Sequence, residues 1–144
     1  MEPEPEQPTA SEVAAFIASV DDATLEDQIT ALGVDTVLAQ VFEAMAGRFL
    51  PSKAPGRAAV IQYDLRLRDG SVRSWQLSIA EGSCAAAQGT DRAAQVTAEM
   101  ALPRFMRLLT GALEPVAAFL SGELKVRGDV MLAQQMQSWF DRAV

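Results

Sequence analysis

Histidine is absent from the 144-residue sequence, and Cys84 is its only cysteine. Without histidine, neither a Ser-His-Asp nor a Cys-His catalytic arrangement can be assembled from this chain alone. One thiol cannot supply the ligands of a Cys/His zinc site, and it cannot form an internal disulfide. We therefore expect no metal or other cofactor, no enzymatic activity, no export to an oxidising compartment, and an inert Cys84 in or near a strand.

Basic residues are absent from the first third of the chain. No lysine or arginine precedes Arg48, whereas ten carboxylates lie between Met1 and Gly47, and the net charge of the whole chain is −7. Because phosphate contacts require clustered positive charge, we expect no nucleic-acid partner. Two interpretations of the acidic segment stay open. It forms a solvated face with a disordered tail, or it packs on the more basic remainder and shields it.

Long apolar runs are also missing, because none approaches the roughly 18 to 20 residues that span a bilayer. The first ten residues, MEPEPEQPTA, are acidic and proline-rich, unlike a signal or transit peptide. The last four, from Asp141 to Val144, contain no peroxisomal signal of the Ser-Lys-Leu type. We expect no transmembrane segment and a cytoplasmic location.

What the chain has is enough apolar sequence for a real core. Apolar residues make up 49% of it, and its length suits one domain that buries roughly 68% of its unfolded surface. Residues 1–10 are predicted to form a disordered acidic, proline-rich tail. Residues 11–33 are predicted to form an acidic helical extension, and residues 34–144 the main domain.

Three helices are predicted before the first strand. A short helix covers 11–18, and a second begins at Asp21 or Asp22 and ends at Gly33. An apolar stripe with a spacing of three and four residues predicts the third, over 35–50. Such a stripe suits plain core or one wall of a cavity.

The apolar period changes to two over residues 59–82, which predicts a β-hairpin with a tight turn at Asp69 and Gly70. Alternating apolar and polar residues are typical of an antiparallel sheet that is covered on one face only. Further strands are predicted within 83–90 and 93–101. If the hairpin and the last strand share a sheet, its wet face carries five basic side chains: Arg66, Arg68, Arg73, Lys125 and Arg127. That face is a solvated surface, or a dock for an acidic head group or for the acidic N-terminus.

Helices follow over 102–111 and 113–122, each with an early proline and a final glycine. A short strand within 123–129 leads to the last helix, for which Asp129 is the predicted N-cap. Because strands and helices are segregated along the chain, we expect an α+β fold rather than a wound parallel sheet.

Three stretches resemble the sterol carrier protein 2 family. SGELKVRGDVMLAQQMQSWF resembles its closing signature, YDLRLRDGSVRSWQLSIAEGS its hairpin, and LPRFMRLLTGALEPVAAFLSGEL its central helix pair. The similarity runs from about Asp35 to Phe140 and suggests a stand-alone, bacterial-type member. Glu123 departs from the family, in which a basic residue is common at that position.

The resemblance implies a mostly antiparallel five-stranded sheet with helices packed on one face and an apolar tunnel between them. It implies non-enzymatic binding or transfer of a fatty acid, fatty acyl-CoA, sterol-like or isoprenoid lipid. Methionine suits the walls of such a tunnel because its flexible thioether side chain repacks around different ligands. Eight residues are the predicted lining: Trp75, Phe105, Met106, Leu109, Phe119, Met131, Met136 and Phe140.

The same residues could instead form ordinary core. In that case we expect a dimerisation or accessory module of a lipid-related pathway that has no ligand of its own. Its partner would be a second copy of the chain or an enzyme of lipid metabolism.

Overall fold

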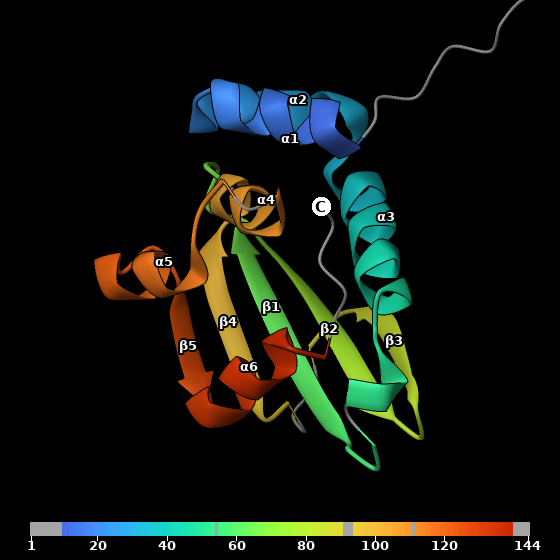
Figure 1. Cartoon of the computed structure of the whole chain (residues 1–144). Coiled ribbons are helices and arrows are strands. Elements are labelled where there is room, and N and C mark those ends of the chain that lie inside the picture. Colours follow the sequence, from blue (N-terminus) through green and yellow to red (C-terminus); the bar gives the residue numbers. More distant parts are fainter. Residues whose placement is uncertain (1–9, 54, 91–93, 111, 140–144) are drawn as a thin grey trace, which may run out of the picture.

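The structure is a computed structural model that describes residues 10–53, 55–90, 94–110 and 112–139 (Figure 1). Its elements follow one another in this order: α1 (Ala10–Ser19), α2 (Asp22–Leu32), α3 (Val34–Gly47), a 3-10 turn η1 (Pro51–Lys53), β1 (Ala59–Arg66), β2 (Val72–Ala80), β3 (Ser83–Gln88), β4 (Val96–Ala101), α4 (Leu102–Thr110), α5 (Pro115–Ser121), β5 (Lys125–Gly128) and α6 (Val130–Gln137). The predicted α+β class and the order of its elements are confirmed.

The five strands form one mixed sheet in the order β3-β2-β1-β4-β5. Only β1 and β4 are parallel neighbours among them, and the other three pairs are antiparallel. The central strand β1 therefore touches both halves of the sheet. In the register, Tyr63 lies opposite Trp75 on one side and Ala98 on the other.

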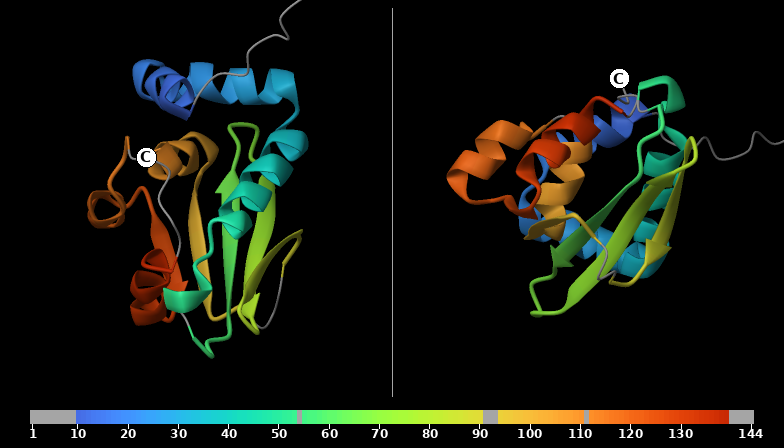
Figure 2. Two further views of the ribbon diagram at one scale, coloured as in Figure 1. Left: turned by 45° about the vertical axis from the view of Figure 1, so that its right-hand side comes forward. Right: turned by 90° about the horizontal axis from the view of Figure 1, so that it is seen from below.

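Helices cover one face of this sheet (Figure 2). Helix α3 packs on β2 and β3, α4 on β1 and β4, and α6 on β4. The side chains beneath them alternate along each strand, as the period of two predicted, and the fully enclosed ones include Leu65, Leu77 and Met100. This apolar layer is the core of the molecule, and the opposite sheet face is polar.

Local signals in the sequence set the ends of several elements. The backbone N–H of Thr24 donates to the Asp21 carboxylate at 2.7 Å, so Asp21 caps α2 as predicted. Asp129 caps α6 in the same way, through a 3.0 Å hydrogen bond from the backbone N–H of Leu132. Gly128 has a φ of +94°, and a Cβ at that position would lie 2.2 Å from the Gln95 carbonyl oxygen. Only glycine therefore fits this turn between β5 and α6.

Helix α3 ends at Gly47, three residues before the predicted end at Leu50. The backbone N–H of Leu50 donates instead to the Trp139 carbonyl at 2.7 Å. This bond ties the exit of α3 to the chain just beyond α6. The helix therefore ends three residues earlier than predicted, and Leu50 is bonded to a distant part of the chain instead.

Two of the five basic side chains expected on the wet sheet face are not there. Arg73 lies opposite the buried Leu65, on the covered face, and its guanidinium is 3.0 Å from the Asp35 carboxylate of α3. Arg68 lies beyond the end of β1 and binds the carboxylates of Glu26 and Asp27 on α2. The prediction was wrong for these residues because both arginines turn toward acidic partners on the N-terminal helices.

The acidic N-terminal helices α1 and α2 lie across the end of the sheet and pack on α4 (Figure 1). Arg107 of α4 donates to the backbone carbonyls of Ile17 and Val20, both at 2.6 Å, and to the Asp22 carboxylate at 3.0 Å. Arg104 also reaches Asp22, at 3.0 Å. For the described residues, these contacts match the interpretation in which the acidic segment packs on the more basic remainder.

Candidate functional site

Four aromatic side chains meet beneath the helices, and we call them the aromatic cluster: Phe42, Tyr63, Trp75 and Phe105. The Phe42 ring of α3 stacks on Trp75 of β2 at 5.1 Å between centroids and on Phe105 of α4 at 5.3 Å. Tyr63 of β1 is tilted against Phe42 at 5.3 Å and against Phe105 at 5.6 Å. These separations and angles are those preferred by aromatic pairs. The cluster joins the centre of the sheet to α3 and α4, two of the helices that cover it.

Two polar groups of this cluster lie in apolar surroundings. Trp75 is only 7% exposed, and its indole Nε1–H is buried with no hydrogen-bond acceptor within reach among the described residues. Tyr63 is half-buried, and burial raises the pKa of its phenol well above the ordinary range, with a smaller contribution from Cys84. The phenol therefore stays neutral at any physiological pH. The cluster is an apolar site with two neutral hydrogen-bonding groups.

The structure brings together four of the eight predicted lining residues. Trp75 and Phe105 belong to the aromatic cluster through their shared neighbour Phe42. Met106 and Leu109 of α4 are partly buried and pack against the same core. All four side chains therefore belong to the apolar core between the sheet and the helices.

The remaining four are not brought to that region within the described part of the chain. Phe119 of α5 is 46% exposed, and Met131 of α6 is 66% exposed. The side chain of Met136 and the whole of Phe140 lie outside the described residues. The tunnel lining as a set therefore stays a prediction.

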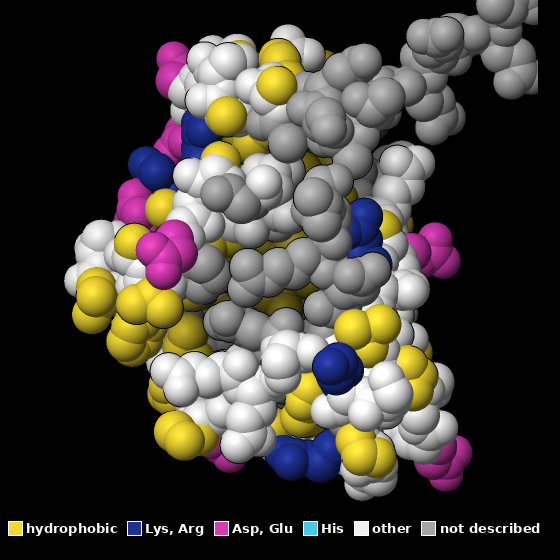
Figure 3. Space-filling view, in the orientation of Figure 1, with side chains coloured by type: hydrophobic (Ala, Val, Ile, Leu, Met, Phe, Trp, Pro, Cys, Tyr) yellow, Lys and Arg dark blue, Asp and Glu magenta, His cyan; other side chains and the backbone are white. Residues whose placement is uncertain are grey.

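Apolar side chains gather on the surface of α5 (Figure 3). Five exposed apolar residues lie on this helix and at the start of α6, and we call them the α5–α6 patch: Val116, Phe119, Leu120, Val130 and Met131. Their exposed fractions range from 40% to 79%. Several exposed apolar residues close together on one helix mark a contact site more often than an isolated exposed leucine does.

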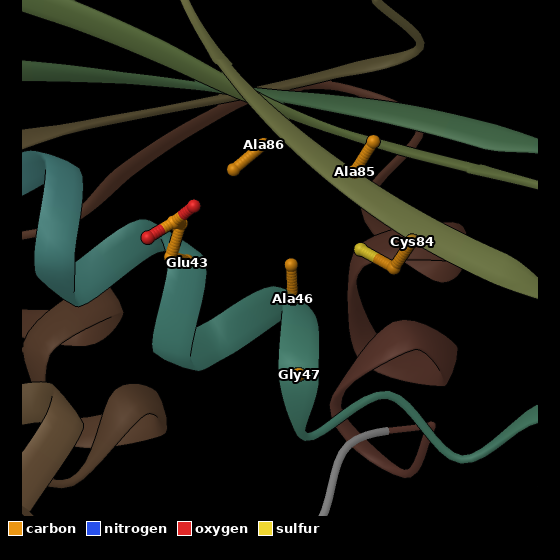
Figure 4. A pocket seen from close by; sticks show the side chains of 6 residues that line it. All are labelled: Glu43, Ala46, Gly47, Cys84, Ala85 and Ala86. Carbon is orange, nitrogen blue, oxygen red and sulfur yellow. The ribbon is translucent and has the colours of Figure 1, made fainter.

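Two open clefts lie among the described residues, and neither is lined by the aromatic cluster. The first, of about 570 Å³, separates α3 from β3, with Glu43 and Ala46 facing Cys84 and Ala86 (Figure 4). Burial raises the pKa of the Cys84 thiol to about 11, so the nucleophilic thiolate is scarce at neutral pH. This agrees with the expectation of an inert cysteine.

The second cleft, of about 580 Å³, lies between α2 and the hairpin loop. Ion pairs line it, and the buried Glu26 carboxylate is held by both the backbone N–H and the guanidinium of Arg68, at 3.1 and 3.2 Å. Its charged side chains bind one another and serve to fix α2 on the hairpin.

The open sheet face carries a paired polar network rather than a free basic patch. Asp64 accepts hydrogen bonds from Gln62 at 2.9 Å and from Ser74 at 2.8 Å. Arg127 lies 3.7 Å from both Asp64 and Glu99. Arg127 is thus paired rather than free, and its partly exposed ion pairs contribute about 0–1 kcal/mol each.

Metal and membrane signals are weak in the described residues. No group of three or more Cys, Asp or Glu side chains among them could hold a metal ion. None of the described helices is by itself long and apolar enough to cross a bilayer. Taken together, α2 and α3 have the length and composition of a membrane span, but they are bent by 96° at their junction.

Sequence reasoning missed Phe42 and Tyr63 as members of the site. Phe42 was assigned only to the apolar stripe of its helix, and Tyr63 only to the hairpin alternation. The sequence did contain a signal for Tyr63. If the apolar side chains of the two hairpin strands are placed opposite one another, Tyr63 pairs with Trp75, as it does in the structure.

The chain is an α+β domain in which helices cover the apolar face of a five-stranded, mostly antiparallel sheet. The sequence pattern of the SCP-2 sterol transfer family matches residues 50–141, from the exit of α3 to just past α6. The chain belongs to this family.

Known proteins of the family resemble the chain over part of its length. Hydroxysteroid dehydrogenase-like protein 2 of Mus musculus is 34% identical over 79 residues, which are 55% of this chain and 16% of that protein. Sterol carrier protein 2 of Homo sapiens is 32% identical over 69 residues, 48% of this chain and 13% of that protein. The chain thus spans about a sixth or less of these relatives. The solved structure of palmitated SCP2L2 from Aedes aegypti shares the fold, with a TM-score of 0.58 and 20% identity over 72% of this chain and 95% of that one.

Proposed function

We propose that this chain binds an apolar small molecule between the covered face of its sheet and the helices, and carries it without changing it chemically. The ligand is a fatty acid, a fatty acyl-CoA, a sterol-like compound or an isoprenoid lipid. The observation that carries the proposal is the match to the SCP-2 sterol transfer family over residues 50–141. The palmitated Aedes aegypti structure, which has the same fold, supports a long acyl chain as one ligand.

The aromatic cluster and α4 supply the physical basis. Each methylene moved from water to an apolar wall contributes roughly 0.8 kcal/mol, so a long acyl chain contributes on the order of 10 kcal/mol before ordering costs. Met106 and Leu109 of α4 are partly buried, pack against the same hydrophobic core and offer flexible aliphatic surface. The lining we propose therefore begins at Trp75 and Phe105 and continues along α4.

Native mass spectrometry of the freshly purified full chain, followed by organic extraction, tests the proposal directly. We expect a bound species of defined mass that extraction releases as a lipid. A bare chain that also takes up neither labelled fatty acids nor labelled sterols would contradict it.

A pair of variants locates the site. Leu109→Trp adds a large ring in the proposed lining, whereas Leu32→Trp adds the same ring on a surface where the native leucine is 72% exposed. We expect the first variant to lower lipid occupancy at least about tenfold and the second to leave it unchanged, at equal melting temperature. Equal occupancy in both variants would place the ligand elsewhere.

A second candidate function is self-association, and the α5–α6 patch favours it. A second copy of the chain would cover the patch and leave the interior filled. Sedimentation over a range of concentrations tests this, with Leu120→Ser as the variant, because Leu120 is 79% exposed and its loss spares the core. A dimer that the substitution abolishes would support this candidate, and a monomer at all concentrations would remove it.

A further inference from the structure

Two hydrogen-bond donors lie side by side on the covered face of the sheet. Tyr63 and Trp75 are cross-strand partners in the β1–β2 register, so their side chains leave the sheet on the same face. Both belong to the aromatic cluster, where Phe42 contacts each ring. The pair thus places two polar atoms in the middle of an apolar layer.

The Trp75 indole N–H is fully enclosed and makes no hydrogen bond to any of the described residues. Native proteins pair the large majority of their buried polar groups, because an unpaired donor has lost its water without receiving a partner. A buried donor of this kind indicates an acceptor that lies outside the described residues, such as an oxygen atom of a bound ligand.

Tyr63 supplies the second group. A phenol is neutral at physiological pH, and burial raises the pKa of Tyr63 further, so its hydroxyl can donate or accept a hydrogen bond. The residue lies half-buried on the central strand beneath the helices. The hydroxyl therefore adds a second neutral hydrogen-bonding group to the covered layer.

The charge near the pair limits what the acceptor can be. The nearest arginine along β2, Arg73, is bound to Asp35 at 3.0 Å and to Ser71 at 3.2 Å. Arg107 of α4 is occupied by Asp22 and by two backbone carbonyls. Neither Arg73 nor Arg107 is therefore free to pair with a carboxylate at the cluster, and an unpaired charge is costly in such surroundings.

We infer that Trp75 and Tyr63 form a neutral polar anchor that selects apolar ligands carrying one uncharged oxygen acceptor, such as a ketone, ester or alcohol. The anchor disfavours pure hydrocarbons, which leave the indole N–H unpaired, and fatty acid anions, which bring an unpaired charge. The inference rests on the proposed function, because it names the chemical class of ligand for that same site.

Three ligands of equal chain length separate these classes: hexadecane, 2-hexadecanone and palmitate. Each is titrated against the full chain loaded with the neutral fluorescent probe diphenylhexatriene, at about pH 8, where palmitate is ionised. We expect 2-hexadecanone to displace the probe at about tenfold lower concentration than hexadecane, as one hydrogen bond in an enclosed site predicts. Palmitate is expected to be weaker than 2-hexadecanone.

Two variants remove the donors and keep the rings. Trp75→Phe and Tyr63→Phe should each reduce the preference for 2-hexadecanone severalfold, with little change in hexadecane affinity. Trp139→Phe is the matched control, because Trp139 is equally buried, at 4% exposure, but lies outside the aromatic cluster. Tyr63→Phe keeps the test decisive if Trp75→Phe does not fold.

The outcomes distinguish this inference from the proposed function. If neither the probe nor any of the three ligands binds the native chain, the proposed function fails. If hexadecane binds as well as 2-hexadecanone, if palmitate binds best, or if both donor variants retain the native preference, the neutral anchor alone is overturned.

Discussion

Arg107 should contribute more to stability than any other arginine that binds the N-terminal helices. Its side chain is only 13% exposed, and its three hydrogen bonds end on Asp22 and on the carbonyls of Ile17 and Val20. The two carbonyls lie at the C-terminal end of α1, where backbone acceptors have no partner inside the helix and a positive charge is favourable. Replacing Arg107 by alanine removes all three bonds at once.

The expected cost follows from these contacts. Hydrogen bonds with a charged donor contribute about 1.5–3 kcal/mol each, but Asp22 keeps its second ion pair with Arg104. Water can also reach the two carbonyls once the guanidinium is gone. We therefore expect Arg107→Ala to lower the free energy of unfolding by about 3 kcal/mol and Tm by roughly 10 °C.

The matched control is Arg104→Ala. Arg104 is 35% exposed and makes two ion pairs, with Asp22 and Glu123, both at 3.0 Å. Such pairs contribute about 0–1 kcal/mol and are screened by salt. Urea denaturation followed by circular dichroism, at low salt and at about 0.5 M salt, should show a large and salt-resistant loss only for Arg107→Ala. Equal losses in the two variants would refute this account of how α1 is held.

Three further predictions concern the core, one turn and the thiol. Leu77→Ala empties a fully buried site and should cost about 2–5 kcal/mol in urea denaturation, whereas Leu32→Ala, on the surface, should cost under about 0.5 kcal/mol. Gly128→Ala places a Cβ 2.2 Å from the Gln95 carbonyl oxygen, at a residue whose φ is +94°. We therefore expect a low yield of folded protein or a much lower Tm, and an unchanged Tm would contradict the turn geometry. The pKa of Cys84 rises from 9.0 in the unfolded chain to about 11 in the fold, because burial disfavours the thiolate. Its contribution to stability is therefore complete below about pH 9 and is lost as pH rises through 11, and alkylation by iodoacetamide at neutral pH should be slower in the folded chain than in urea.

The hairpin shows how far local patterns predict the fold. Asp69 and Gly70 were predicted to form a tight turn, and the backbone N–H of Leu67 donates to the Ser71 carbonyl at 2.9 Å, which closes a loop of three residues. A two-residue turn would shift the register by one and place Tyr63 opposite Gln76 rather than Trp75. The apolar alternation on both strands rejects that register, because a slip of one residue moves every side chain to the other face.

The candidate site was only partly predictable. Trp75 and Phe105 were named from the sequence, and the fold brings them together through Phe42. Phe119 and Met131 were named by the same reasoning, and both are largely exposed. A helical stripe shows which residues share a face but not what that face meets, because the partner comes from distant parts of the chain.

By itself, the sequence determined the class of the protein. Its apolar periods, caps and glycines specify the order of the elements, since these signals act over a few residues along the chain. The absence of histidine excludes Ser-His-Asp and Cys-His arrangements built from this chain alone, and this conclusion needs only the composition.

Only the tertiary structure decided which side chains meet. The enclosed indole N–H of Trp75, the neutral Tyr63 beside it and the three bonds of Arg107 each depend on segments far apart in the sequence. Burial and hydrogen-bond satisfaction are properties of the packed chain, because they depend on every neighbour in space rather than on neighbours in sequence.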